Sequence, residues 1–224
     1  MVFDNKNLGF TLLETLIALS VVSVGVMAAF TLSTANLNTA KANYQRVLAA
    51  NLAREGVEIV RNIRDSNWLK IQANADCDGV ENGTQLCAWN SGLDKNKSIV
   101  SFDASLRLGR EIAYESIIED CFTDGTCKLK EGSLHHYQHS TGENTNMARL
   151  IILKAICRDT DGDVTSPNAY GIKVSEDIDC YAWADGYEEK IGLQVTSQVY
   201  WQDFSKTHTI EVVEELYNWR EYEN

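Results

Sequence analysis

The chain has 224 residues and carries 32 acidic against 20 basic residues, a formal charge of −12. This length fits one folded domain with an appendage, and a composition of 44% hydrophobic residues with 1 proline and 14 glycines excludes disordered and collagen-like chains. The acidic charge opposes the counterion release on which sequence-independent nucleic-acid binding depends, so no nucleic-acid partner is expected.

A long apolar segment lies near the amino terminus. From Thr15 to Ala40 the chain has 26 consecutive uncharged residues, and a helix of about 20 residues crosses ~30 Å of hydrocarbon. Three interpretations are open: a buried core helix, a cleaved secretory signal with a small-x-small site at residues 40–42, and a retained membrane helix. The absence of a polar stripe argues against the first, and a run longer than the usual 7 to 15 residues argues against the second.

Glu14 is the only charged residue between Lys6 and Lys41. A carboxylate at this depth of an apolar helix costs ~2.5 kcal/mol or more unless it is neutralised or meets a cation. The segment therefore predicts a partner for Glu14.

Residues 8–14 (LGFTLLE) resemble the processing site of type IV pilins and type II secretion pseudopilins. The resemblance implies cleavage after Gly9 by a prepilin peptidase, methylation of the new amino terminus on Phe10, and Glu14 as the acid used in assembly. It also implies other pilin or pseudopilin subunits, an inner-membrane assembly platform and membrane lipid as partners. The chemistry is reasonable, because a small Gly9 admits a protease and the new α-amine can pair with a carboxylate of a neighbouring helix.

The helix is expected to continue beyond the membrane. No proline interrupts residues 40–64, and apolar residues recur there near helical spacing. One helix from Phe10 to about Arg64 is predicted, with Gly25 and Gly56 as flexible points. Residues 54–68 resemble the end of the long helix in minor pilins.

The last third of the sequence is rich in strand signals. Residues 147–157 are branched and apolar, residues 170–174 form a shorter candidate, and alternating apolar residues predict a hairpin near the carboxyl terminus. An apolar hairpin face needs a partner, which the long helix can provide. The predicted fold class is therefore α+β, with a long amino-terminal helix packed against a carboxyl-terminal antiparallel sheet, the type IV pilin fold.

These patterns divide the chain into five parts. A cleaved leader spans residues 1–9, the membrane-spanning and assembly half of the helix spans 10–35, and its amphipathic half spans 36–66. A variable, disulfide-bearing insertion spans 67–146, and the sheet with its hairpin spans 147–224. Residues 199–219 resemble the last hairpin of minor pilins.

Six cysteines lie between residues 77 and 180, which favours an oxidising compartment over buried thiols. Six cysteines allow fifteen pairings. Pairing between sequence neighbours is favoured and joins Cys77 to Cys87, Cys121 to Cys127, and Cys157 to Cys180.

Two turns rich in oxygen ligands are candidates for calcium. The first contains Asn74, Asp76 and Asp78 but has Gln85 where a calcium loop has glutamate, and the second contains Asp159, Asp161 and Asp163. The alternative for both is a solvated turn.

The histidines at positions 135, 136 and 139 lack the ligand spacing of a zinc site and are expected in a surface loop. No nucleophile-elbow, phosphate-loop or zinc-protease motif occurs, so the chain is not expected to be an enzyme and requires no cofactor. Tryptophans at strand positions are expected in the core, so adhesion lacks support.

The sequence thus predicts a structural subunit of a type IV pilus-like filament, closest to a minor pilin. It would be a single-pass inner-membrane precursor and then part of an extracellular or periplasmic filament. The alternatives are a type II secretion pseudopilin, a membrane-anchored adhesin or binding protein that does not polymerise, and a secreted enzyme that loses its first 42 residues.

Overall fold

The computed structural model describes residues 11–73, 80–81, 84–85, 88–100, 117–132, 136–159, 171–180, 187–203 and 206–218. The chain divides into two units, residues 1–47 and residues 48–224, and the second unit is called the head below. The elements in chain order are α1 (Leu12–Gln72), β1 (Val80–Glu81), β2 (Thr84–Gln85), β3 (Lys97–Ser98), α2 (Ile118–Thr123), β4 (Lys128–Glu131), β5 (Tyr137–Gln138), β6 (Glu143–Asp159), β7 (Ile172–Val174), β8 (Tyr187–Asp203) and β9 (Lys206–Tyr217).

Helix α1 is one element of 61 residues. It begins after Thr11, whose side-chain oxygen accepts a hydrogen bond from the backbone N–H of Glu14 at 3.3 Å, as a helix N-cap does. No proline interrupts it, and it continues to Gln72, about two turns beyond the end expected near Arg64.

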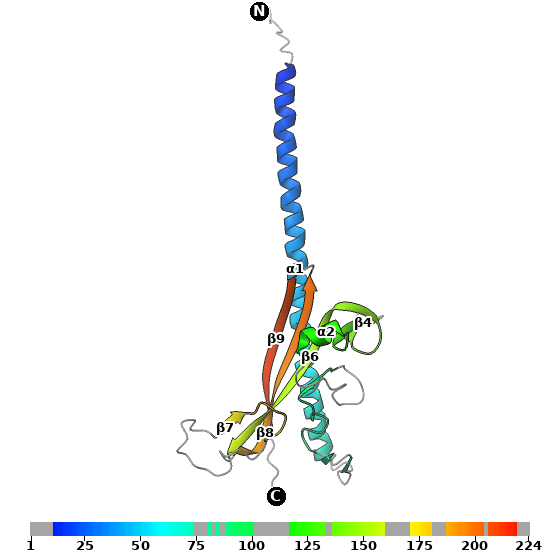
Figure 1. Cartoon of the computed structure of the whole chain (residues 1–224), viewed down its shortest axis with the longest axis vertical. Helices are drawn as coiled ribbons and strands as arrows, with labels where there is room; N and C mark the ends of the chain where they lie inside the picture. Colours follow the sequence, from blue (N-terminus) through cyan, green and yellow to red (C-terminus); the bar gives the residue numbers. More distant parts are fainter. Residues whose placement is uncertain are drawn as a thin grey trace, which may run out of the picture. The chain divides into compact units, whose positions relative to one another are not determined.

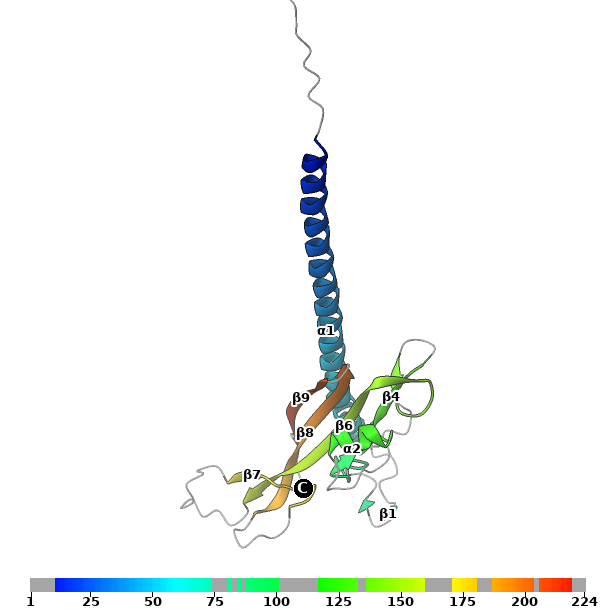
Figure 2. The same cartoon turned by 45° about the horizontal axis from the view of Figure 1, so that its top comes forward.

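The head contains an antiparallel sheet of long and short strands with strand order β5-β4-β6-β8-β9 (Figure 1). Strands β3 and β7 also pair with β6, so β4, β3 and β7 follow one another along one edge of β6 while β8 occupies the other edge. The long strands β6, β8 and β9 run side by side in both views (Figure 2). Strands β1 and β2 form a separate small ladder.

The two faces of the sheet are covered by different helices. On the inner face, the part of α1 within the head packs against β6, β8 and β9, and the shared core contains Val57, Val60, Ile63, Ile151, Leu153, Leu193 and Val195. On the outer face, α2 packs against alternate residues of β6 and β8, including Leu150 and Tyr200. Strand β6 is therefore buried on both sides, which explains its long apolar run.

The α+β class and the long helix with an antiparallel sheet are confirmed. The branched run at 147–157 lies within β6, residues 172–174 form β7, and β8 and β9 form the carboxyl-terminal hairpin. Within the stretch 67–146, β3, β4 and β5 belong to the same sheet as β6, whereas β1 and β2 form their own ladder and α2 packs on the sheet.

Gly56 is a point of close contact between α1 and the sheet. A Cβ atom at this position would meet the Ser197 hydroxyl, would lie 2.9 Å from Ile151 Cδ1 and would lie 3.2 Å from Arg149 Cδ. The glycine therefore sits where the helix packs tightly on β6 and β8, and its expected role as a flexible point stays a prediction. Gly25, the other such residue, has open space around it.

Candidate functional site

The first unit presents an uninterrupted apolar surface. Every side chain from Thr11 to Lys41 is exposed, and the large apolar ones among them include Leu16, Val22 and Phe30. Helix α1 is long and apolar enough to cross a membrane, and the protein itself buries none of its apolar window. An apolar surface of this extent requires lipid or other apolar helices around it.

Hydroxyl groups within this apolar segment are satisfied inside the helix. The hydroxyls of Ser20, Ser23, Thr31 and Thr39 donate to backbone carbonyls three or four residues earlier, at 2.7 to 2.9 Å. Such bonding removes the cost of placing these groups in hydrocarbon. Glu14 is then the one ionisable side chain between residues 11 and 40.

Glu14 is the third residue of α1 and is exposed. A carboxylate in the first turn interacts favourably with the helix dipole and its unpaired N–H groups, and its exposure leaves it accessible to a cation from another chain. Gly9 and Phe10, the residues of the expected cleavage site, lie outside the described residues.

The structure joins four of the six cysteines in the neighbouring pairs that the sequence favours. Cys121 in α2 is bonded to Cys127 just before β4, and Cys157 in β6 is bonded to Cys180 after β7. The first bridge links α2 to the start of β4, and the second links β6 to the segment after β7. Cys77 and Cys87 lie outside the described residues.

The calcium candidates fall almost entirely outside the described part of the chain. This holds for Asn74, Asp76, Asp78, Asp161 and Asp163, while the backbone of residue 159 ends β6 and its side chain is not described. Among the described residues, no group of three or more histidine, cysteine or acidic side chains could hold a metal ion.

The tryptophans that the structure describes belong to the core. Trp68 in α1, Trp89 in a turn before β3 and Trp201 in β8 are buried, and Trp201 confirms the expectation for a strand position. Trp183 and Trp219 lie outside the described residues.

His139 follows β5 and faces the interior, whereas His136 is exposed and His135 lies outside the described residues. The His139 Nδ1 atom lies 3.1 Å from the carbonyl oxygen of Lys128. Burial, and to a smaller extent the positive charge of Arg149, lower the pKa of His139 to about 4, and the contact with the Lys128 carbonyl opposes both effects.

We expect the head to lose stability between pH 6.5 and pH 4. Because the folded pKa of His139 is depressed, the unfolded chain binds the proton first, and stability fully present above the unfolded pKa of about 6.5 is lost as the pH falls through about 4. The loss should reach about 2 to 3 kcal/mol. Urea unfolding across this pH range measures it, and His139→Gln should flatten the profile while His136→Gln leaves it unchanged.

Arg149 is a buried cation that the sequence analysis did not single out. Its side chain is 0% exposed, and its guanidinium donates to the carbonyls of Leu52 in α1 at 3.1 Å and of Val100 at 2.9 Å. Glu55 lies 3.5 Å from it. Burial lowers the pKa of Arg149, and Glu55 opposes that shift. The hydrogen bonds of this guanidinium thus connect β6 with α1 and with the segment after β3.

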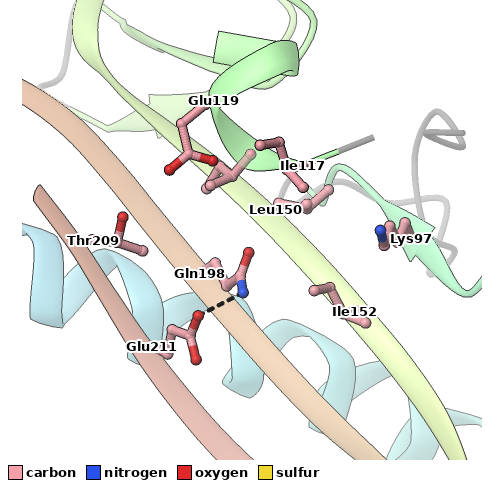
Figure 3. Close-up of a pocket in the computed structure, with 9 residues that line it drawn as sticks. Lys97, Ile117, Glu119, Leu150, Ile152, Gln198, Thr209 and Glu211 are labelled. Carbon is pink, nitrogen blue, oxygen red and sulfur yellow. Dashed lines mark hydrogen bonds between the residues drawn. The ribbon is translucent and has the colours of Figure 1, made fainter. Parts of the chain in front are cut away.

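A groove of about 350 Å³ opens on the outer face of the sheet. Leu150 and Ile152 of β6 line it together with the start of α2, and the carboxylates of Glu119 and Glu211 lie toward the β9 side (Figure 3). Gln198 donates to Glu211 at 2.6 Å, and Lys97 lies at the opposite end. This groove could not be predicted from the sequence, because its residues come from five separate elements or their flanks.

Comparison with known proteins assigns the amino-terminal segment. Residues 4–30 match the family model described as the prokaryotic N-terminal methylation motif. No curated protein and no solved structure matches the chain.

The chain therefore carries the prepilin-type signal of type IV pilins and pseudopilins, and this signal supports a precursor of the kind that prepilin peptidase processes. The motif is that of a structural family rather than an enzymatic one. The signal and the apolar helix together support a membrane-anchored precursor.

Proposed function

We propose that this chain is a structural subunit of a type IV pilus-like filament, of the minor-pilin kind. The observation that carries the proposal is a methylation motif joined directly to an exposed apolar helix whose one ionisable side chain is Glu14. The bonded cysteine pairs of the head support a location outside the reducing cytoplasm.

Assembly follows from the electrostatics of the helix end. Cleavage between Gly9 and Phe10 creates an α-amine next to an apolar helix, and methylation keeps its positive charge. Inside a bundle of such helices, an unpaired charge is costly. An ion pair between the amine of one subunit and Glu14 of its neighbour reduces this free-energy cost for both groups. The pairing also fixes the stagger of neighbouring subunits on the inner-membrane platform.

The test is the amino terminus of the mature protein, determined by mass spectrometry of membrane and sheared-filament fractions. N-methylated Phe10 in sheared filaments is the expected result. Processed chain found only in the cell envelope would favour a secretion pseudopilin instead. An intact Met1 would leave a membrane-anchored binding protein or adhesin, and a start at Asn43 would indicate a secreted protein.

Glu14→Gln should reduce filament incorporation at least about tenfold while cleavage after Gly9 continues. Loss of a desolvated ion pair removes more than ~1.4 kcal/mol per subunit contact, which is a factor of ten in an association constant. Immunoblots of sheared filaments, normalised to processed protein in membranes, measure the effect. Glu176→Gln, a change of an exposed head residue, is the control, and equal incorporation of both variants would contradict the role of Glu14.

Calcium binding by the two turns at residues 74–78 and 159–163 stays a prediction. The proposed function requires neither calcium nor any other cofactor.

A further inference from the structure

Strand β9 forms an outer edge of the sheet. It has 12 residues, and among the described strands it pairs only with β8. Its register with β8 is unbroken from Gly192↔Tyr217 to Asp203↔Lys206, whereas the β6–β8 and β4–β6 ladders both contain irregularities. The edge thus has neither a proline nor a bulge, the usual features that prevent another strand from adding to it.

Two hydrogen bonds show which backbone groups of β9 point away from β8. The Asn218 N–H donates to the Ile191 carbonyl at 2.7 Å, so the even-numbered positions face β8. The Tyr217 carbonyl instead accepts from Arg64 of α1 at 3.4 Å, so it points to the other side. Because the two directions alternate along an antiparallel strand, the N–H and C=O groups of residues 207, 209, 211, 213 and 215 point away from β8.

The side chains at these five positions are exposed, and two of them are acidic. Val213 is 54% exposed between Glu211 and Glu215. Like charges placed opposite each other destabilise a strand pair. Pairing of β9 with the same strand of a second copy would bring the acidic residues of both strands into one ladder, whereas a basic strand would be attracted.

The groove on the outer face of the sheet extends to the edge strand β9. Thr209 and Glu211 of β9 line it, and Glu119 of α2 places a second carboxylate on the β9 side (Figure 3). A strand added beside β9 would direct every second side chain to this same face. A basic side chain there would lie next to Glu211 on the adjacent strand, at the β9 side of the groove.

We propose that the free edge of β9 binds an extended segment of another polypeptide as an added strand, one in which basic residues alternate with β-branched residues. The backbone hydrogen bonds of the added strand would supply affinity. The pairing of its basic side chains with Glu211, which lines the groove, and with Glu215 would supply specificity. This interaction does not depend on processing at Gly9 or on filament assembly.

A designed peptide tests the proposal with the full-length chain in detergent micelles. The probe is a short fluorescent peptide in which lysine, threonine and valine alternate so that the lysines share one face, and its control replaces each lysine with glutamate. Fluorescence anisotropy should show at least about tenfold tighter binding of the lysine peptide. Equal binding of the two peptides, or no binding of the lysine peptide, would overturn the proposal.

Charge reversal in the protein gives the matching experiment. Glu211→Lys combined with Glu215→Lys should weaken the lysine peptide at least about tenfold and strengthen the glutamate peptide. Glu176→Lys combined with Glu189→Lys changes the net charge equally at exposed positions outside β9 and should leave both affinities unchanged. Weakening by the second pair to the same degree would show a general charge effect and would overturn the assignment to β9.

Amide hydrogen exchange tests whether the peptide pairs with the edge of β9. Saturating peptide should slow exchange at the amides of Thr209, Glu211 and Val213, whereas Ile210 and Val212 are already protected by β8. A peptide N-methylated at every second amide, with its charges kept, should lose binding. Protection confined to other strands, or protection of these amides by self-association without peptide, would overturn the proposed partner.

Discussion

Replacing Arg149 with alanine is expected to lower the free energy of unfolding of the head by about 3 to 5 kcal/mol. The change leaves a cavity at a fully buried position and removes the donors that reach the carbonyls of Leu52 and Val100. It also leaves Glu55 without the cation that lies beside it. A buried carbonyl that loses its partner costs about 1 to 3 kcal/mol by itself.

Urea unfolding of the full-length chain, followed by the fluorescence of its buried tryptophans, measures this loss. Arg158→Ala is the matched control, because Arg158 is on the same strand but its side chain is 48% exposed and its contact with Glu189 lies at the surface. Arg149→Lys should give an intermediate loss, since one ammonium cannot reach both carbonyls as the planar guanidinium does. A loss below about 1 kcal/mol for Arg149→Ala would show that the site is not a structural junction.

The position of Arg149 explains why a charge is tolerated in the centre of the sheet. It lies on the inner face of β6 with Met147 on one side and Ile151 on the other, and all three contact elements far away in sequence. The helix carbonyl to which Arg149 donates belongs to Leu52, which is 97 residues earlier in the chain. One side chain therefore fixes where α1, β6 and the segment after β3 meet.

The amino-terminal signal and the long helix could be predicted from the sequence because their evidence is local. The methylation motif matches residues 4–30, and the apolar run that indicates the helix begins in the same segment. The hairpin of β8 and β9 could be predicted for a similar reason, since its period-two alternation lies in adjacent segments.

The middle of the chain could not be predicted in this way. The apolar run of β6 is buried on both faces, so alternation does not show which residues face α1 and which face α2. Arg149 lies within this run, and the pattern does not show that it faces α1. The partners of Arg61 and Arg64 are equally distant in sequence, because Arg61 contacts Glu214 of β9 and Arg64 reaches the Tyr217 carbonyl.

Gly56 is the second position where a small change should have a large effect. Gly56→Ala adds a methyl group that meets Ser197 and lies 2.9 Å from Ile151 Cδ1, and overpacking of this kind costs about 1 to 3 kcal/mol even though alanine favours the helix by about 1 kcal/mol. Thermal or urea unfolding of the head measures it. Gly25→Ala, at a helical glycine with open space around it, should leave head stability unchanged.

Ser197 provides the control that separates crowding from any other effect of the new methyl group. Its hydroxyl is buried and makes no hydrogen bond to the described residues, so Ser197→Ala alone should be neutral or slightly stabilising. In a double-mutant cycle, Ser197→Ala should recover at least about 1 kcal/mol of the loss caused by Gly56→Ala. Additive effects would contradict the close approach, because two residues in contact through one crowded space must couple.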